Sequence, residues 1–367
     1  MSKQQLYAGR DEMEENDRNA AIEERRRKRK DERLKRRREK NIKRLRISLR
    51  IMIPILCAAA AAAALLWNSN GKTEAAQSPE SVVSTATGET EEADPPFSAS
   101  ETADTATLGD DIESDYAVVI NVSTGEIVAE KNARTPISIA SMTKILTLLV
   151  ASENLTAGDL DKTVEITTAI TDICYKNGCS VTGFVLGEKP TVRDLLYGAI
   201  LPSGADSALA LAYYVAGSQE AFADMMNDEL DALGLAPSAH FTNCIGLFDS
   251  EHYCSVYDMA VIMKAASDVE ICREVMSAHT YSTAPTTQHP DGMILSNWFL
   301  RRIEDKDCGS AKVLCAKTGY VTQSGSCAAS LAETEKGVTY ICVTAMAGSS
   351  WSCIYDHAAL YKRFAAG

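Results

Sequence analysis

Histidine is scarce in this sequence, and the residue spacings of metal sites are missing. Among 367 residues only five are histidine, and none belongs to a His-x-x-Glu-His or similar group. The eleven cysteines are spaced in a way that fits no zinc ribbon. We therefore expect a protein that works without a metal ion or other cofactor.

Basic residues are scarce after residue 50. Residues 1–50 contain 19 Lys/Arg and 10 Asp/Glu, a net charge of +9, whereas the rest contains 18 and 40, a net charge of −22. The basic clusters at 25–30 and 35–38 lack aromatic residues that would stack on bases, and acidic residues lie between them. This pattern favours anionic lipid over nucleic acid as a partner. A plain topology signal without a further partner is the alternative.

Long uncharged runs are also rare, and the one from Ile51 to Trp67 is therefore informative. As a helix its 17 residues would span about 25 Å, just enough for a bilayer core. The basic flank predicts a transmembrane anchor at 51–67, a cytoplasmic segment at 1–50 and an extracellular remainder. A cleaved signal peptide is the alternative, but the leader is too long and no Ala-x-Ala site follows the run.

Residues 68–112 lack the apolar side chains that a folded core needs. They contain one Lys, ten acidic residues and many Ser, Thr, Ala and Pro. This composition predicts a disordered acidic linker. The folded domain is then expected at 113–367.

Ten of the eleven cysteines follow the predicted anchor, and an even number outside the membrane is compatible with disulfides. Cys174 and Cys179 flank an Asn177-Gly178 turn signal, which predicts that they form a bridge if the compartment is oxidising. Cys327 and Cys342 lie in strand-like runs, where a buried free thiol is expected.

Two short motifs carry the clearest chemical signal. Ser141 and Lys144 form a Ser-x-x-Lys box at the start of an apolar helix pattern, which places them one turn apart on one face. A Lys-Thr-Gly box, Lys317–Gly319, lies 176 residues after Ser141. Ser69 and Lys72 fit the first pattern too, but in a stretch with no sign of folding, so that match is fortuitous.

Strand-like and helix-like patterns are arranged in three blocks from residue 115 onward. Two strands come first, a mostly helical stretch follows, and three strands and a helix end the chain. Strands at both ends of a domain predict one α/β domain in which distant segments share a sheet. The predicted strands are 116–122, 126–130, 312–320, 326–332 and 338–345, and the predicted helices are 139–152, 191–200, 219–233, 256–266 and 355–364.

Residues 115–367 resemble the serine D-alanyl-D-alanine carboxypeptidases, which are low-molecular-mass penicillin-binding proteins. Besides the two boxes, the resemblance includes the stretches Asp194–Asp206, His240–Leu247 and Tyr257–Ala260, in the expected order. It implies an α+β fold of the β-lactamase/transpeptidase type, with a five-stranded antiparallel sheet flanked by helices and a helical subdomain. The active site is expected where the two parts meet.

The resemblance also implies a role for each motif residue. Acyl transfer needs a nucleophile, a base, an oxyanion hole and a grip on the substrate. The implied substrates are peptidoglycan stem peptides, and β-lactam antibiotics are the implied covalent inhibitors. By resemblance the roles are Ser141 as nucleophile, Lys144 as base, Ser203 as proton relay, Lys317 and Thr318 as carboxylate ligands, Gly319 for close backbone approach, and the N–H groups of Ser141 and Tyr320 as oxyanion hole.

One box departs from the family pattern. The family has Ser-x-Asn where this chain has Ser203-Gly204-Ala205, and a methyl group cannot bind the substrate backbone as an amide does. Asp206 would point about 100° away on a helix. A penicillin sensor or wall-binding module with little turnover is therefore an alternative function. A serine β-lactamase is disfavoured, because no Glu-x-x-x-Asn element follows Ser203 in the expected region.

Overall fold

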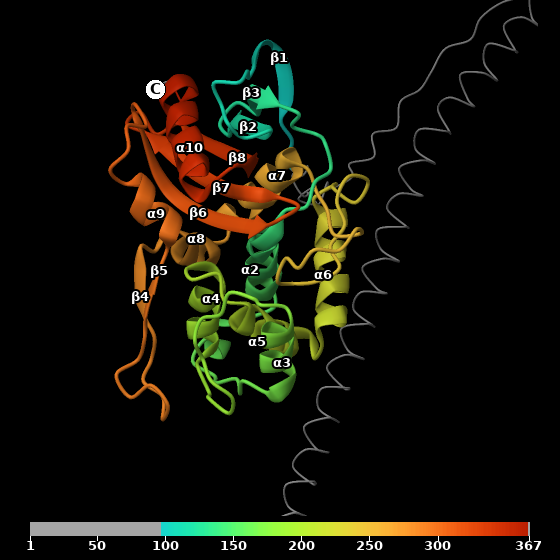
Figure 1. Ribbon diagram of the computed structural model, residues 1–367, viewed down its shortest axis with the longest axis vertical. Helices are drawn as coiled ribbons and strands as arrows, with labels where there is room; N and C mark the ends of the chain where they lie inside the picture. The colour runs from blue at the N-terminus through green and yellow to red at the C-terminus, as the bar shows by residue number, and fades with distance from the viewer. Residues whose placement is uncertain (1–96, 366–367) are drawn as a thin grey trace, which may run out of the picture. The chain divides into compact units, whose positions relative to one another are not determined.

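A mixed sheet forms the centre of the upper part of the molecule in Figure 1. The computed structural model describes residues 97–365, and its main sheet has the strand order β1-β3-β2-β8-β7-β6. All neighbours from β3 to β6 pair antiparallel, so the predicted α+β fold is confirmed, but the sheet has six strands where five were predicted. The strands are β1 Ser100–Thr107, β2 Tyr116–Asn121, β3 Glu126–Lys131, β6 Ala311–Val321, β7 Gly325–Thr334 and β8 Thr339–Ala347.

The sixth strand, β1, overturns part of the predicted linker. It pairs parallel with β3, although its side chains are mostly exposed. Leu108 and Ile112, which follow it, are buried. The composition of this segment was misleading because the strand is held mainly by backbone hydrogen bonds at the edge of the sheet, not by apolar burial. The predicted segments 1–50 and 51–67, and the rest of the linker up to residue 96, lie outside the described residues.

Helices cover both faces of the sheet. Side chains of β2 alternate between the two faces of the sheet. Ala117 and Val119 belong to the core under α9 and α10. Val118 and Ile120 belong to the core on the opposite face. The first face carries α9 Trp298–Ile303 and α10 Ser350–Phe364, and the second carries α7 Val256–Asp268 and α8 Glu270–Ser277.

A mostly helical part lies below the sheet in Figure 1. Its central helix, α2 (Thr143–Glu153), is buried along nearly its whole length. The predicted helix start at Thr191 is confirmed, because Thr191 and Asp194 cap α4 reciprocally. The remaining elements are the short helices η1 Ala140–Met142 and η2 Ala157–Asp159, the helices α3 Thr168–Lys176, α4 Val192–Ile200, α5 Ala205–Ala216 and α6 Gln219–Ala232, and a separate hairpin of β4 Thr280–Ser282 and β5 Ile294–Ser296.

Within residues 97–365, no helix combines the length and the apolar character needed to cross a bilayer.

Candidate active site

The Ser-x-x-Lys box lies where the short helix η1 runs into α2. Lys144 Nζ donates a 2.9 Å hydrogen bond to Ser141 Oγ, which the i,i+3 spacing makes possible. The residue before the serine, Ala140, has a φ of 47°, a left-handed backbone that is uncommon for a residue with a Cβ. The predicted pairing of Ser141 and Lys144 is therefore present, on a strained turn.

Burial suits Lys144 to the role of a base. Its side chain is 2% exposed, and burial lowers its pKa from 10.5 to about 8. Besides Ser141, its ammonium group reaches the carbonyl oxygen of Ile245 at 2.7 Å. Near neutral pH a useful fraction of Lys144 is thus unprotonated and able to take the Ser141 proton.

Ser203 and Lys317 meet across the site. Lys317 Nζ donates to Ser203 Oγ at 2.9 Å and to the carbonyl oxygen of Thr318 at 2.6 Å. Ser203 has a φ of 64° and lies just before α5, whereas Lys317 lies on β6. Burial and then the nearby charge of Lys144 hold the pKa of Lys317 well below its usual value. The structure therefore brings the two predicted lysines and two predicted serines together.

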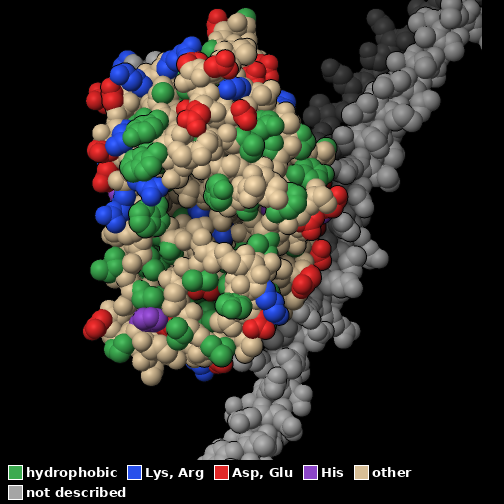
Figure 2. Space-filling view, viewed as in Figure 1, with side chains coloured by type: hydrophobic (Ala, Val, Ile, Leu, Met, Phe, Trp, Pro, Cys, Tyr) green, Lys and Arg blue, Asp and Glu red, His purple; other side chains and the backbone are tan. Residues whose placement is uncertain are grey.

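The edge strand β6 runs close against Ser141. A Cβ built on Gly319 would lie 2.9 Å from the backbone nitrogen of Ser141, so only glycine fits without a shift. Tyr320, one residue later, is 69% exposed. Because β6 ends the sheet, its outer edge is available to pair with an extended peptide. Figure 2 shows this face hollowed between the sheet and the helical part, with Lys or Arg side chains inside the hollow.

Ala205 begins α5 and is 1% exposed. The neighbouring Asp206 is buried, and its carboxylate accepts hydrogen bonds from the backbone N–H groups of Thr182, Gly183 and Ser207. Asp206 thus holds a loop against the start of α5. Because its carboxylate is already bonded to these backbone groups, Asp206 is unsuited to replace the side-chain amide of the family's Ser-x-Asn box, which Ala205 lacks.

Sequence reasoning assigned no role to a second loop that supports the site. Asn243 Oδ1 accepts three backbone hydrogen bonds, from Ile245, Gly246 and Leu247. A Cβ built on Gly246, whose φ is +80°, would lie 2.0 Å from the carbonyl oxygen of Ala140. This loop therefore holds the Ile245 carbonyl against Lys144 and packs on the turn before Ser141. The stretch 240–247 belongs to the family resemblance, which implies no role for its individual residues.

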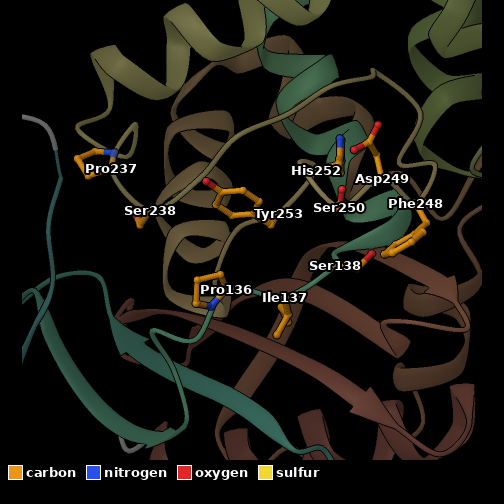
Figure 3. A pocket seen from close by; sticks show the side chains of 10 residues that line it. All are labelled: Pro136, Ile137, Ser138, Pro237, Ser238, Phe248, Asp249, Ser250, His252 and Tyr253. Carbon is orange, nitrogen blue, oxygen red and sulfur yellow. The ribbon is translucent and has the colours of Figure 1, made fainter.

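A surface cavity of about 400 Å³ opens beside the same two segments. Figure 3 shows its walls: residues before the nucleophile turn, such as Pro136 and Ser138, face residues of the 248–253 loop, such as Phe248 and His252. The cavity thus lies next to the loop that supports the site.

Cys174 and Cys179 are free thiols in the structure, so the predicted bridge between them is absent. The predicted turn is present: Gly178 has a φ of 59°, and Cys179 N–H donates to the Cys174 carbonyl. The interaction between their side chains is the main cause that raises the pKa of Cys174 and lowers that of Cys179 to about 7. Cys327 and Cys342 are buried free thiols, as predicted.

No group of three or more His, Cys, Asp or Glu within residues 97–365 is placed to hold a metal ion.

Known proteins are similar to this chain in sequence. The D-alanyl-D-alanine carboxypeptidase DacF of Bacillus subtilis is 29% identical over 215 residues, which are 59% of this chain and 53% of that protein. DacA of Escherichia coli, of the same description, is 34% identical over 159 residues, 42% of this chain and 39% of that protein. This chain thus spans about half the length of DacF and less than half of DacA.

The fold of this chain is also similar to that of solved structures. The crystal structure of the Streptomyces K15 DD-transpeptidase superposes with a TM-score of 0.60 at 28% identity, over 69% of this chain and 97% of that one. The model of the peptidase S11 family, described as D-alanyl-D-alanine carboxypeptidase, matches residues 98–348. This chain is therefore a member of the D-alanyl-D-alanine carboxypeptidase family, peptidase S11.

Proposed function

We propose that this protein is a serine D-Ala-D-Ala carboxypeptidase that trims peptidoglycan stem peptides through an acyl-enzyme. The observation that carries the proposal is the 2.9 Å contact between Ser141 Oγ and the buried Lys144 amine. A nucleophilic hydroxyl with a base at hydrogen-bond distance is what acyl transfer requires. The family membership of residues 98–348 supplies the substrate class.

In the first step Ser141 Oγ attacks the carbonyl carbon between the two D-alanines, and its proton passes to Lys144 Nζ. The carbonyl oxygen becomes an oxyanion, which the N–H groups of Ser141 and Tyr320 stabilise. Lys317 and Thr318 bind the terminal carboxylate. These groups all lie on η1, α2 and the edge of β6.

In the second step the C–N bond breaks and the departing D-alanine nitrogen needs a proton. Ser203 can relay this proton: its hydroxyl proton passes to the nitrogen while Lys317, which donates to Ser203 Oγ, replaces it. Water then hydrolyses the acyl ester: its hydroxyl bonds to the acyl carbon, its other proton returns to Lys317, and Lys144 returns a proton to Ser141 Oγ as the ester C–O bond breaks. A β-lactam would acylate Ser141 by the same first step, with its amide bond as the one that breaks.

A penicillin sensor or wall-binding module is the second candidate. It is favoured by Ala205, since Asp206 is held by backbone groups and cannot supply the missing amide. Such a protein would acylate without appreciable turnover.

Two measurements separate these functions. Intact mass of the protein with and without penicillin should show one penicilloyl adduct, lost in Ser141→Ala, and D-alanine should be released from a pentapeptide. An adduct that survives Ser141→Ala or maps to Ser69 would refute the assignment. An adduct without D-alanine release identifies the sensor, and rapid turnover of penicillin identifies a β-lactamase.

We further propose that residues 51–67 anchor the protein in the cell membrane with residues 1–50 in the cytoplasm and the domain outside. The support is the uncharged run and the net charge of +9 before it. Protease added to intact cells should then remove the domain. Recovery of the protein as a soluble fragment that begins soon after Ala64 would contradict the anchor.

A further inference from the structure

The peptide group between Ala140 and Ser141 is held from two sides. Its carbonyl oxygen accepts a 2.7 Å hydrogen bond from Thr143 Oγ1, and Gly246 packs so closely on it that a Cβ there would lie 2.0 Å away. A peptide group is planar and trans, so its N–H points opposite to its C=O. The backbone N–H of Thr143 also bonds this carbonyl oxygen. The side-chain bond from Thr143 fixes it from a second direction and so helps to set the direction of the Ser141 N–H, which is one of the two proposed oxyanion-hole donors.

Thr143 is in turn held by His252. Thr143 Oγ1 lies 2.8 Å from His252 Nε2, and the single hydroxyl proton of Thr143 is already given to the Ala140 carbonyl, which can only accept. His252 Nε2 must therefore carry a proton and donate it to Thr143 Oγ1.

The other ring nitrogen fits the same tautomer. His252 Nδ1 accepts the backbone N–H of Thr242 at 3.0 Å, and the amide Nδ2 of Asn243 lies 3.3 Å from it. A second proton on the ring would place two donors face to face. His252 is also only 2% exposed, and burial is the main cause that lowers its pKa from 6.5 to about 4. The charge of Asp249 opposes this shift and that of His240 adds to it.

We propose that His252 is a positioning residue for acylation: its Nε2–H, through the Thr143 hydroxyl, orients the Ala140–Ser141 peptide so that the Ser141 N–H faces the oxyanion. The inference rests on the proposed function. It deepens that function by giving a role to a residue 111 positions from the nucleophile. In Figure 3 His252 lies on the loop that borders the cavity beside the nucleophile segment.

The chain offers a matched control. His357, on α10, is equally buried and neutral: burial lowers its pKa to about 3, and its ring nitrogens contact Ser330 Oγ and Thr344 Oγ1. It packs in the core on the opposite face of the sheet from α2. Replacing it removes comparable buried hydrogen bonds without touching the nucleophile turn.

The test compares wild type, Thr143→Val, Thr143→Ser, His252→Leu, His252→Gln and His357→Leu in the full-length protein. Penicillin acylation rate, kcat and KM for a D-alanyl-D-alanine peptide, and the inhibition constant of a peptide boronic acid are measured. The tetrahedral boronate places an oxygen in the oxyanion hole. We expect Thr143→Val and His252→Leu to lower the acylation rate and the boronic acid affinity together, by about 10- to 100-fold, with KM little changed.

Conservative variants distinguish a loss of peptide orientation from a general loss of folding. Thr143→Ser keeps the hydroxyl and His252→Gln keeps an N–H near the Nε2 position, so both should recover most of the lost rate. His357→Leu should lower the melting temperature but not the boronic acid affinity. Loss of rate in His357→Leu equal to that in Thr143→Val, or an unchanged boronic acid affinity in Thr143→Val, overturns the inference.

Wild-type protein gives an independent measurement. Long-range ¹H–¹⁵N spectra should show His252 as the neutral tautomer with its proton on Nε2, and a proton on Nδ1 would refute the inference even if no variant folds. Failure of wild type to acylate at Ser141 overturns the proposed function instead. The two failures are therefore distinguishable.

Discussion

Lys144 Nζ lies 2.9 Å from Ser141 Oγ, and burial brings the pKa of this lysine down to about 8. Because only the unprotonated amine accepts the Ser141 proton, the rate of acylation by a β-lactam should rise with pH and level off above about 8. Lys144→Arg stays protonated throughout and should lower the rate by about 10²- to 10⁴-fold. Stopped-flow rates between about pH 6 and 10 measure both effects. A pH-independent rate would exclude Lys144 as the base.

Gly319 should tolerate no side chain. In Gly319→Ala the new methyl group would lie 2.9 Å from the Ser141 nitrogen and 2.9 Å from Cys327 Sγ, so the nucleophile turn and β6 must move apart. A displacement of this kind costs about 100-fold in rate. Penicillin labelling measures the loss. The control is Gly158→Ala, whose methyl group would meet only Thr156 Oγ1, at 3.9 Å; equal losses in the two variants would contradict the explanation.

Ala205→Asn should restore the side-chain amide of the family's Ser-x-Asn box. A substrate hydrogen bond contributes about 0.5–1.5 kcal/mol, and more if a buried carbonyl is otherwise unpaired. Peptide turnover should therefore rise by about 3- to 100-fold, with little change in penicillin acylation. Ala205→Leu, of similar shape without the amide, is the control for crowding at this buried position. If Asn raises turnover no more than Leu does, another group already binds the substrate backbone.

Cys179 should be the most reactive of the ten described thiols. It is the one that is not buried, and its interaction with Cys174 lowers its pKa to about 7, which favours the reactive thiolate. Iodoacetamide at pH 7, followed by peptide mapping, should modify Cys179 before Cys174, Cys327 or Cys342. Cys179→Ser should remove this first modification. Fast labelling of Cys174 instead would contradict the described geometry.

Local hydrophobic patterns in the sequence predicted most strands of the sheet, and the strand that they missed has a physical explanation. The strands β2, β3, β6, β7 and β8 have the apolar runs that buried strands require. In contrast, β1 reads SETADTAT and is stabilised by pairing along the edge of β3, which leaves no pattern in its side chains.

Some contacts of the candidate site were likewise predictable from the sequence, and others were not. Ser141 and Lys144 could be paired from their helical spacing alone, whereas their juxtaposition with Ser203 and Lys317 came only from the family resemblance. His252 contacts the Thr143 hydroxyl across 109 positions of the chain, and such a contact has no characteristic residue spacing. Asn243 bonds the backbone of residues 245–247, next to it in the chain, but the carbonyl that this local turn presents to Lys144 lies on another segment.

The burial of Lys317 beside Lys144 makes ligand binding a proton-linked equilibrium. A carboxylate that binds there would raise the pKa of Lys317 from its depressed value in the free protein, so at a pH between the free and bound pKa values binding would draw protons from the solvent. Calorimetry in buffers of different ionisation enthalpy would register this uptake as a buffer-dependent heat. Within that range, substrate affinity should weaken as pH rises, whereas the rate of attack by Ser141 should increase. Turnover at low substrate concentration should therefore pass through a maximum as the pH is raised.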